Sequence, residues 1–191
     1  MKVKLNPMFE EARGDLGDLV FREVRGKTVV SRKADMSILV PSEGQLAHRE
    51  KFRQAAAYGR SALGNETLRE FYAEAAERQD KPIFALTVAD FMNPPVIGQV
   101  DLSPYNGQTG DLILLTATDD FGVENVYVMI TNGQGNAVES GEAVQNPASP
   151  NHWTYMATAS LPAGDTANIR IVATDRPRNS AVVRESKVIQ P

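Results

Sequence analysis

The chain has 191 residues, of which 42% are hydrophobic and 23% charged, a composition typical of a folded globular protein. Its net charge of −4 does not favour nucleic acid or an anionic membrane as a partner. It contains no cysteine, which excludes disulfides, thiolate metal sites and cysteine nucleophiles.

The first residues do not form a signal peptide, because Asn6, Pro7, Glu10 and Glu11 interrupt the apolar run that such a peptide needs. No other window approaches the roughly 20 apolar residues of a membrane helix. We therefore expect synthesis in the cytoplasm without a signal peptide, and no membrane partner.

Composition and charge change near residues 91–98, where Asn93, Pro94 and Pro95 cannot continue a helix. The part before this point is net +1 and the part after it is net −5. The first part has helical periodicity and the second has strand periodicity. The sequence therefore predicts two domains, 1–95 and 96–191.

The first domain is predicted to be α+β, with a β-hairpin and three helices. The hairpin pairs 18–24 with 27–32, and Gly26 lies in its turn. A capping box at Ser42–Gln45 predicts a helix to about residue 63, followed by helices from 66 to 79 and after a cap at Asp80. The residues expected on the buried side of the first helix are Phe52, Ala55, Ala56, Gly59 and Leu63.

The second domain is predicted to be an all-β, immunoglobulin-like (Ig-like) sandwich. Apolar residues alternate at Val126, Val128 and Ile130, and the single tryptophan, Trp153, is expected to anchor the core. The expected strands are 96–102, 111–118, 123–131, 136–140, 152–160, 166–174 and 181–189.

Two stretches of this half, "LTATDDFGVENVYVMITNGQGNAVESGEA" and "IRIVATDRPRN", resemble bacterial Ig-like modules. Those modules often carry A-x-D-x-x-G-V before one strand and A-x-D-x-P-G-N before the last. Here Arg178 stands where they usually have glycine. The resemblance implies a fold and a role as a spacer or adhesive unit, not an activity.

The N-terminal half resembles a group of uncharacterised bacterial proteins that share G-x-x-G-x-x-V, G-x-x-x-x-x-R and P-[ST]-E-x-Q-x-x-x-R-x-x-F. The matching residues are Gly14, Gly17, Val20, Gly26, Arg32, Pro41, Ser42, Glu43, Gln45, Arg49 and Phe52. This resemblance implies a family and no mechanism.

No catalytic constellation is evident, so we expect no enzyme, no catalytic residue and no cofactor. The two histidines, His48 and His152, fall in different predicted domains without a partner at metal-ligand spacing. The sequence has no phosphate-binding G-x-x-x-x-G-K-[ST] motif and no G-x-S-x-G elbow.

Four aspartates are candidate calcium ligands: Asp101, Asp119, Asp120 and Asp175. The two segments "TDDFG" and "TDRPRN" could lie near each other at strand ends. However, Arg176 and Arg178 are as close to Asp175 in sequence and oppose a cation, and Asp in turns commonly binds its own backbone. The sequence alone therefore predicts turn capping and no metal.

Basic residues form two groups, one on the hairpin and one at i, i+4, i+11 spacing on the first helix. Glutamates are interleaved with them and no row of aromatics offers base stacking, so we do not expect nucleic acid as a partner. An acidic protein surface, including the second half of a neighbouring copy, suits them better. The candidate interaction residues are Arg22, Arg25, Lys27, Arg32, Arg49, Arg53 and Arg60.

The leading functional hypothesis is a non-enzymatic structural subunit. It would assemble with itself or with other protein subunits, as part of a larger, phage-type particle, through residues 1–95, and it would project the Ig-like domain. The alternative is a ligand-binding module that recognises glycan or peptide through the sandwich loops.

Overall fold

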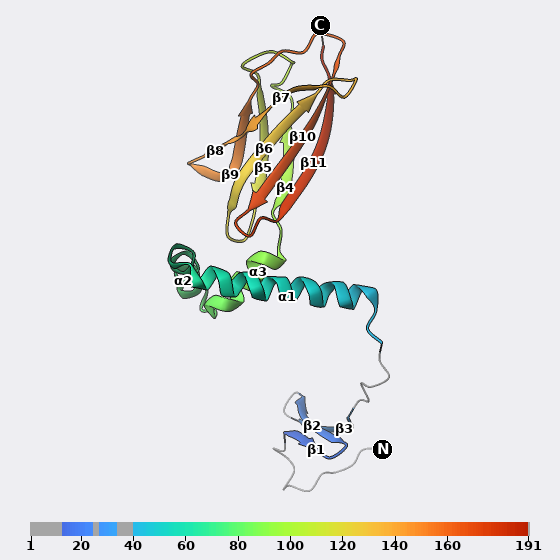
Figure 1. Ribbon diagram of the computed structural model, residues 1–191, viewed down its shortest axis with the longest axis vertical. Coiled ribbons are helices and arrows are strands. Elements are labelled where there is room, and N and C mark those ends of the chain that lie inside the picture. Colours follow the sequence, from blue (N-terminus) through green and yellow to red (C-terminus); the bar gives the residue numbers. More distant parts are fainter. Residues whose placement is uncertain (1–12, 25–26, 34–39, 191) are drawn as a thin grey trace. The chain divides into compact units, whose positions relative to one another are not determined.

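The computed structural model describes residues 13–24, 27–33 and 40–190 (Figure 1). The chain divides into two compact units, residues 1–46 and residues 47–191. The first unit contains a small sheet, and the second contains most of the helical segment and a β-sandwich. No helix in the described ranges has the length and apolar character needed to cross a membrane.

The small sheet has three antiparallel strands in the order β1-β2-β3: β1 (Gly14–Leu16), β2 (Leu19–Val24) and β3 (Lys27–Arg32). The predicted pairing of the hairpin is confirmed, with Leu19 opposite Arg32 and Val24 opposite Lys27. The predicted turn residue Gly26 lies outside the described residues. The strand β1 was not predicted, and it reaches β2 through a turn in which Gly17 has a φ of 57°, a conformation that favours glycine.

The three predicted helices are present as α1 (Glu43–Gly64), α2 (Glu66–Gln79) and α3 (Ile83–Met92). The predicted capping box is confirmed. The Ser42 amide donates to Gln45 Oε1 at 3.1 Å, and the Gln45 amide donates to Ser42 Oγ at 3.3 Å. The expected cap at Asp80 is wrong: Asp80 ends α2 in a left-handed conformation, its amide donating to the Ala76 carbonyl.

The helices share a core around Ala62, Tyr72, Ala75 and Leu86. The expected burial of Phe52 is wrong, since this side chain is 52% exposed, whereas Ala55 and Gly59 on the same helix are buried. At Gly59 the helices α1 and α3 approach closely, because a Cβ atom there would lie 2.6 Å from Thr87 Oγ1 and 3.0 Å from the Phe84 ring.

We expect Gly59→Ala to destabilise the protein by about 1–3 kcal/mol, because the added methyl group forces two packed helices apart. Gly64→Ala is the matched control: it adds the same methyl group to the same helix, with no other atom within 4 Å. The control should be neutral or slightly stabilising, since alanine is the better helix former. Chemical denaturation monitored by circular dichroism measures both, and equal effects would contradict close packing at Gly59.

The sandwich consists of two four-stranded antiparallel sheets (Figure 1). One has the order β4-β5-β9-β8 and the other β11-β10-β6-β7. The strands are β4 (Val96–Asp101), β5 (Leu112–Thr118), β6 (Val123–Thr131), β7 (Ala137–Glu142), β8 (Val144–Asn146), β9 (Ser149–Met156), β10 (Thr166–Asp175) and β11 (Ser180–Val188).

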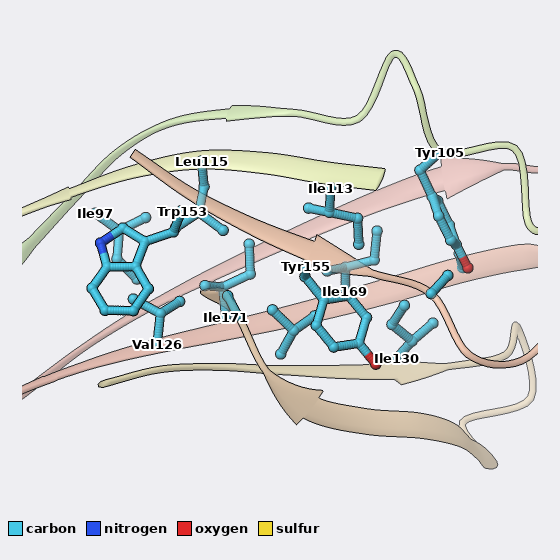
Figure 2. Close-up of a cluster of buried hydrophobic side chains, with 14 of the residues drawn as sticks. Ile97, Tyr105, Ile113, Leu115, Val126, Ile130, Trp153, Tyr155, Ile169 and Ile171 are labelled. Carbon is cyan, nitrogen blue, oxygen red and sulfur yellow. The ribbon is translucent and has the colours of Figure 1, made fainter. Parts of the chain in front are cut away.

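The core of the sandwich lies between the two sheets (Figure 2). Val126, Val128 and Ile130 are fully buried from one side of β6, as their alternation predicts, and Trp153 is buried from β9. A β-sandwich is therefore confirmed for the second half of the chain, and its assignment to the Ig-like class stays a prediction.

The helices also contact the sandwich. Phe121, in the turn between β5 and β6, packs against the helical core, with its ring centroid 5.5 Å from that of Tyr72. The Asn179 side chain donates to the Phe91 carbonyl at 3.2 Å, and Asn93 Nδ2 donates to Asp120 Oδ2 at 2.9 Å. The domain boundary at residue 95 therefore coincides with a segment bridged by side-chain contacts, and it stays a prediction.

Candidate functional site

The small sheet of the first unit exposes apolar side chains and contains no buried residue among its described positions. Leu16 is 64% exposed, Leu19 40%, Val24 50% and Val29 46%. Two or three short strands are marginally stable in water unless an apolar face is covered. An exposed apolar sheet of this kind is characteristic of a surface that binds a partner.

The register distributes these residues over two faces. Because partners in an antiparallel pair point to the same side, Leu16 lies with Leu19, and Phe21 lies with Val30. We call this group of Leu16, Leu19, Phe21 and Val30 the apolar face. The opposite face carries Val20, Val24 and Val29 together with Arg22 and Lys27.

The predicted interaction residues of the hairpin are therefore not brought to one surface. Arg22 and Lys27 lie on one face, Arg32 lies beside Leu19 on the apolar face, and Arg25 lies outside the described residues. Two ion pairs brace the sheet, Arg13 with Glu23 and Lys33 with Asp15, the latter at 2.9 Å. Among the described residues, Arg22, Lys27 and Arg32 form no ion pair and remain available to a partner.

On α1, the predicted row of Arg49, Arg53 and Arg60 is exposed along its whole length. Arg53 binds Glu50 at 2.8 Å, and this hydrogen bond lowers the pKa of the Glu50 carboxyl. His48 is exposed on the same helix and His152 is exposed on β9, and neither belongs to the group of possible metal ligands found among the described residues.

A different set of residues comes together where the helices meet the sandwich. Carboxylate oxygens of Asp90, Asp119 and Asp175 all lie within 4.8 Å of one another. Asp90 comes from α3, Asp119 follows β5, and Asp175 ends β10. We call these three residues the aspartate cluster.

Each carboxylate of the cluster is oriented by a hydrogen bond from the protein. Tyr72 donates its hydroxyl to Asp90 Oδ2, and Tyr58 and Tyr72 are joined through their hydroxyls at 2.9 Å. The Phe121 amide donates to Asp119 Oδ1 at 2.8 Å. Asp175 accepts from the amide and the side chain of Asn179 at 2.6 and 2.7 Å.

Two oxygens of the cluster are buried without a hydrogen-bond partner in the described structure: Asp90 Oδ1 and Asp119 Oδ2. Burial raises the pKa of Asp90 to about 7; the Tyr72 hydrogen bond opposes this change, and the charges of Asp119 and Asp175 add to it. Burial likewise raises the pKa of Asp119 and of Asp175. The site therefore concentrates negative charge where water does not stabilise it.

Arg176 and Arg178, the two arginines next to Asp175 in the sequence, form no ion pair with the aspartate cluster in the described structure. The Arg176 guanidinium lies over the Phe71 ring, 3.8 Å from its centroid, and its buried Nε atom has no hydrogen-bond partner. Within the described residues it forms no ion pair with the cluster, although its charge lowers the pKa of Asp90. Arg178 is exposed and has a φ of 75°, the conformation that favours the glycine of similar modules.

Asp119 and Asp175 lie together, as the turn segments of the sequence suggest, whereas the other two candidates, Asp101 and Asp120, lie elsewhere. Asp101 accepts the Ser103 amide at 2.8 Å in a turn, and Asp120 is exposed and accepts from Asn93. Asp90 was not among the predicted residues, although the sequence of α3 indicates that its carboxylate is unusual. Ile83, Leu86 and Asp90 share the i, i+3, i+7 face of α3, so a carboxylate stands on an otherwise apolar stripe.

A scan of protein-family models finds no match to the chain, and a search of curated proteins finds none either. Solved structures give distant matches. CopC from Methylosinus trichosporium OB3b is 17% identical with a TM-score of 0.40, over 51% of this chain and 94% of that one. BhCBM56, solved as a Br derivative, is 12% identical with a TM-score of 0.32, over 48% of this chain and 99% of that one. Likeness at this level assigns no ligand to the chain.

Proposed function

We propose that the protein is a non-enzymatic structural subunit that assembles with further copies of itself through the small sheet of residues 14–32. The observation that carries the proposal is the exposure of Leu16 and Leu19 on a sheet that has no buried residue among those described. Fully burying one leucine side chain contributes about 1.5–3 kcal/mol, so covering the apolar face would stabilise both the sheet and the assembly.

Charge favours a second copy of this chain as the occupant. Arg32 lies beside Leu19 on the apolar face and Arg22 and Lys27 lie on the opposite face, and none of the three forms an ion pair among the described residues. The second half of the chain, residues 96–191, carries a net charge of −5. A sheet of one copy docked on the sandwich of the next would bring opposite charges together, which steers association and sets its register.

The strand order of the sandwich supports an Ig-like assignment for this part of the chain. Lettering the strands A, B, C, C′, D, E, F and G in chain order makes the sheets A-B-E-D and G-F-C-C′. The A-B-E-D and G-F-C sets are those of Ig-like sandwiches, which agrees with the motif resemblance. We therefore assign the sandwich to the Ig-like class as a part of this proposal, while the phage-type particle remains an expectation from sequence alone.

Sedimentation equilibrium of the full chain tests the proposal. We expect an average mass that rises with concentration to a whole multiple of the chain mass. Raised salt should weaken the association, because screening beyond about 8–10 Å reduces the attraction between the sheet and the acidic sandwich. A monomer at every concentration and at low salt would contradict self-assembly.

A second candidate function, ligand binding, is favoured by one pocket on the sandwich. The pocket has a volume of about 400 Å³, a size typical of small-ligand sites. It presents hydrogen-bonding side chains, but its aromatic residue, Trp153, is only 5% exposed and offers little ring surface for stacking on a sugar. The lining residues include Gln99, Asp101, Thr116, Asn146, His152 and Thr154. A strictly monomeric protein would make this function the better one.

A further inference from the structure

We propose that the aspartate cluster of Asp90, Asp119 and Asp175 binds one calcium ion and thereby fastens the helices to the sandwich. The proposal is independent of self-assembly, since it concerns contacts within one copy of residues 47–191. Three carboxylates from three elements converge within 4.8 Å, and all three elements are held in place by hydrogen bonds or packing around the cluster.

The buried oxygen of Asp90 points to a ligand independently of the clustering. Asp90 is 1% exposed, yet its Oδ1 atom has no hydrogen-bond partner within the described structure. Leaving a buried polar atom without a hydrogen-bond partner destabilises the folded protein, and more so when the group is charged. Asp119 Oδ2 is in the same condition, so two oxygens of the cluster lack the partner that a bound cation would supply.

The charge of the site suits a divalent ion. Three ionised carboxylates together with Arg176, whose charge acts on Asp90, have a net charge of −2 if all are charged. Arg176 is held over Phe71 without an ion pair to the cluster, so it reduces the repulsion among the carboxylates without occupying their centre. A divalent cation would neutralise what remains.

The donor atoms favour calcium over other divalent ions. All three side chains offer hard oxygen ligands. Zinc and copper prefer nitrogen and sulfur donors, so the cluster suits them less well. Magnesium sheds its water reluctantly, whereas Asp90 and Asp175 are 1% and 0% exposed and leave little room for a hydration shell. Calcium accepts irregular geometry and carboxylate oxygens, and the two oxygens without a hydrogen-bond partner in the described structure, Asp90 Oδ1 and Asp119 Oδ2, would be among its ligands.

The pocket beside Asp119 would give the ion an approach to the cluster. A pocket of about 330 Å³ adjoins this residue at the segment between α3 and β4. Asp119 is the one member of the cluster that is only partly buried, and the exposed Asp120 beside it adds negative charge at the entrance. The pocket is lined by Asn93, Pro94, Val96, Thr118, Asp119 and Asp120.

Calorimetric titration of the full chain with calcium chloride, after treatment with a chelator and its removal, tests the proposal. We expect one ion bound per chain and a melting midpoint that rises by several degrees in about 1 mM calcium, because an ion bound only to the folded state stabilises it. Magnesium should bind more weakly. Terbium should show luminescence sensitised by the nearby Tyr72.

Asp90→Asn and Asp119→Asn should each weaken calcium binding by at least about tenfold, since each removes one charged ligand without changing side-chain size. Asp101→Asn is the matched control, because Asp101 belongs neither to the cluster nor to the pocket beside it, and it should bind like the parent protein. Absence of binding heat and of any melting shift in the parent would overturn the proposal, as would full binding by both cluster variants. Neither result alters the sedimentation behaviour on which the proposed function depends.

Discussion

The Trp153→Ala variant is expected to lose about 3–5 kcal/mol of folding stability, which is the usual cost of removing a large aromatic side chain from a core. Trp153 is almost fully buried between the two sheets, in one cluster with Ile97, Leu115, Val126 and Ile171 (Figure 2). Its indole N–H has no hydrogen-bond partner in the described structure, so the loss reflects packing alone. Thermal and urea denaturation followed by circular dichroism measure it.

Two control variants separate packing from other effects. Trp153→Phe keeps an aromatic ring and removes the unpartnered N–H, so it should cost distinctly less than the alanine variant. Met156→Ala alters the same strand at a position that is 61% exposed and should change stability by less than about 0.5 kcal/mol. If Trp153→Ala melted like the parent protein, the sandwich core described above would be wrong.

Replacing Leu16 and Leu19 together by aspartate is expected to weaken self-association about 100-fold. These side chains are cross-strand partners on the apolar face, and burying their exposed surface in a partner contributes about 1.5–3 kcal/mol in total. The added negative charges would also repel the acidic sandwich of the neighbouring copy. Sedimentation velocity over a range of concentrations measures the change.

The matched control for this variant is Val144→Asp with Met156→Asp, which places the same charges on exposed apolar positions of the sandwich. Both double variants should melt near the parent protein, because none of the four side chains is buried in the monomer. If the two double variants assembled equally well, the apolar face of the small sheet would not be the assembly surface.

Local patterns were sufficient for most elements of the fold. The alternation of Val126, Val128 and Ile130 predicts β6, and the capping box at Ser42 predicts the beginning of α1, because both signals depend only on neighbours in sequence. The strand β8 and the beginning of β9 were missed. Pro150 lies inside β9, and proline normally argues against a strand.

The aspartate cluster required tertiary information. Asp119 and Asp175 carry a turn motif that suggests their proximity, but Asp90 joins them only because Phe121 packs into the helical core and brings α3 to the end of the sandwich. The exposure of Phe52 has a similar origin. The spacing of Phe52 places it on the expected buried side of α1, but the residues of this helix that are buried in the described structure are Ala55, Gly59 and Ala62.

Hydrogen–deuterium exchange on the backbone amides of β2 and β3 tests whether the small sheet is the assembly surface, because it reports on this sheet itself in the full chain. Amides of an isolated sheet without a core exchange rapidly, whereas those covered by a partner are protected. We predict protection at concentrations where the protein is assembled, and its loss on dilution and in the Leu16→Asp, Leu19→Asp variant. Rapid exchange of β2 and β3 in a fully assembled sample would show that assembly uses another surface.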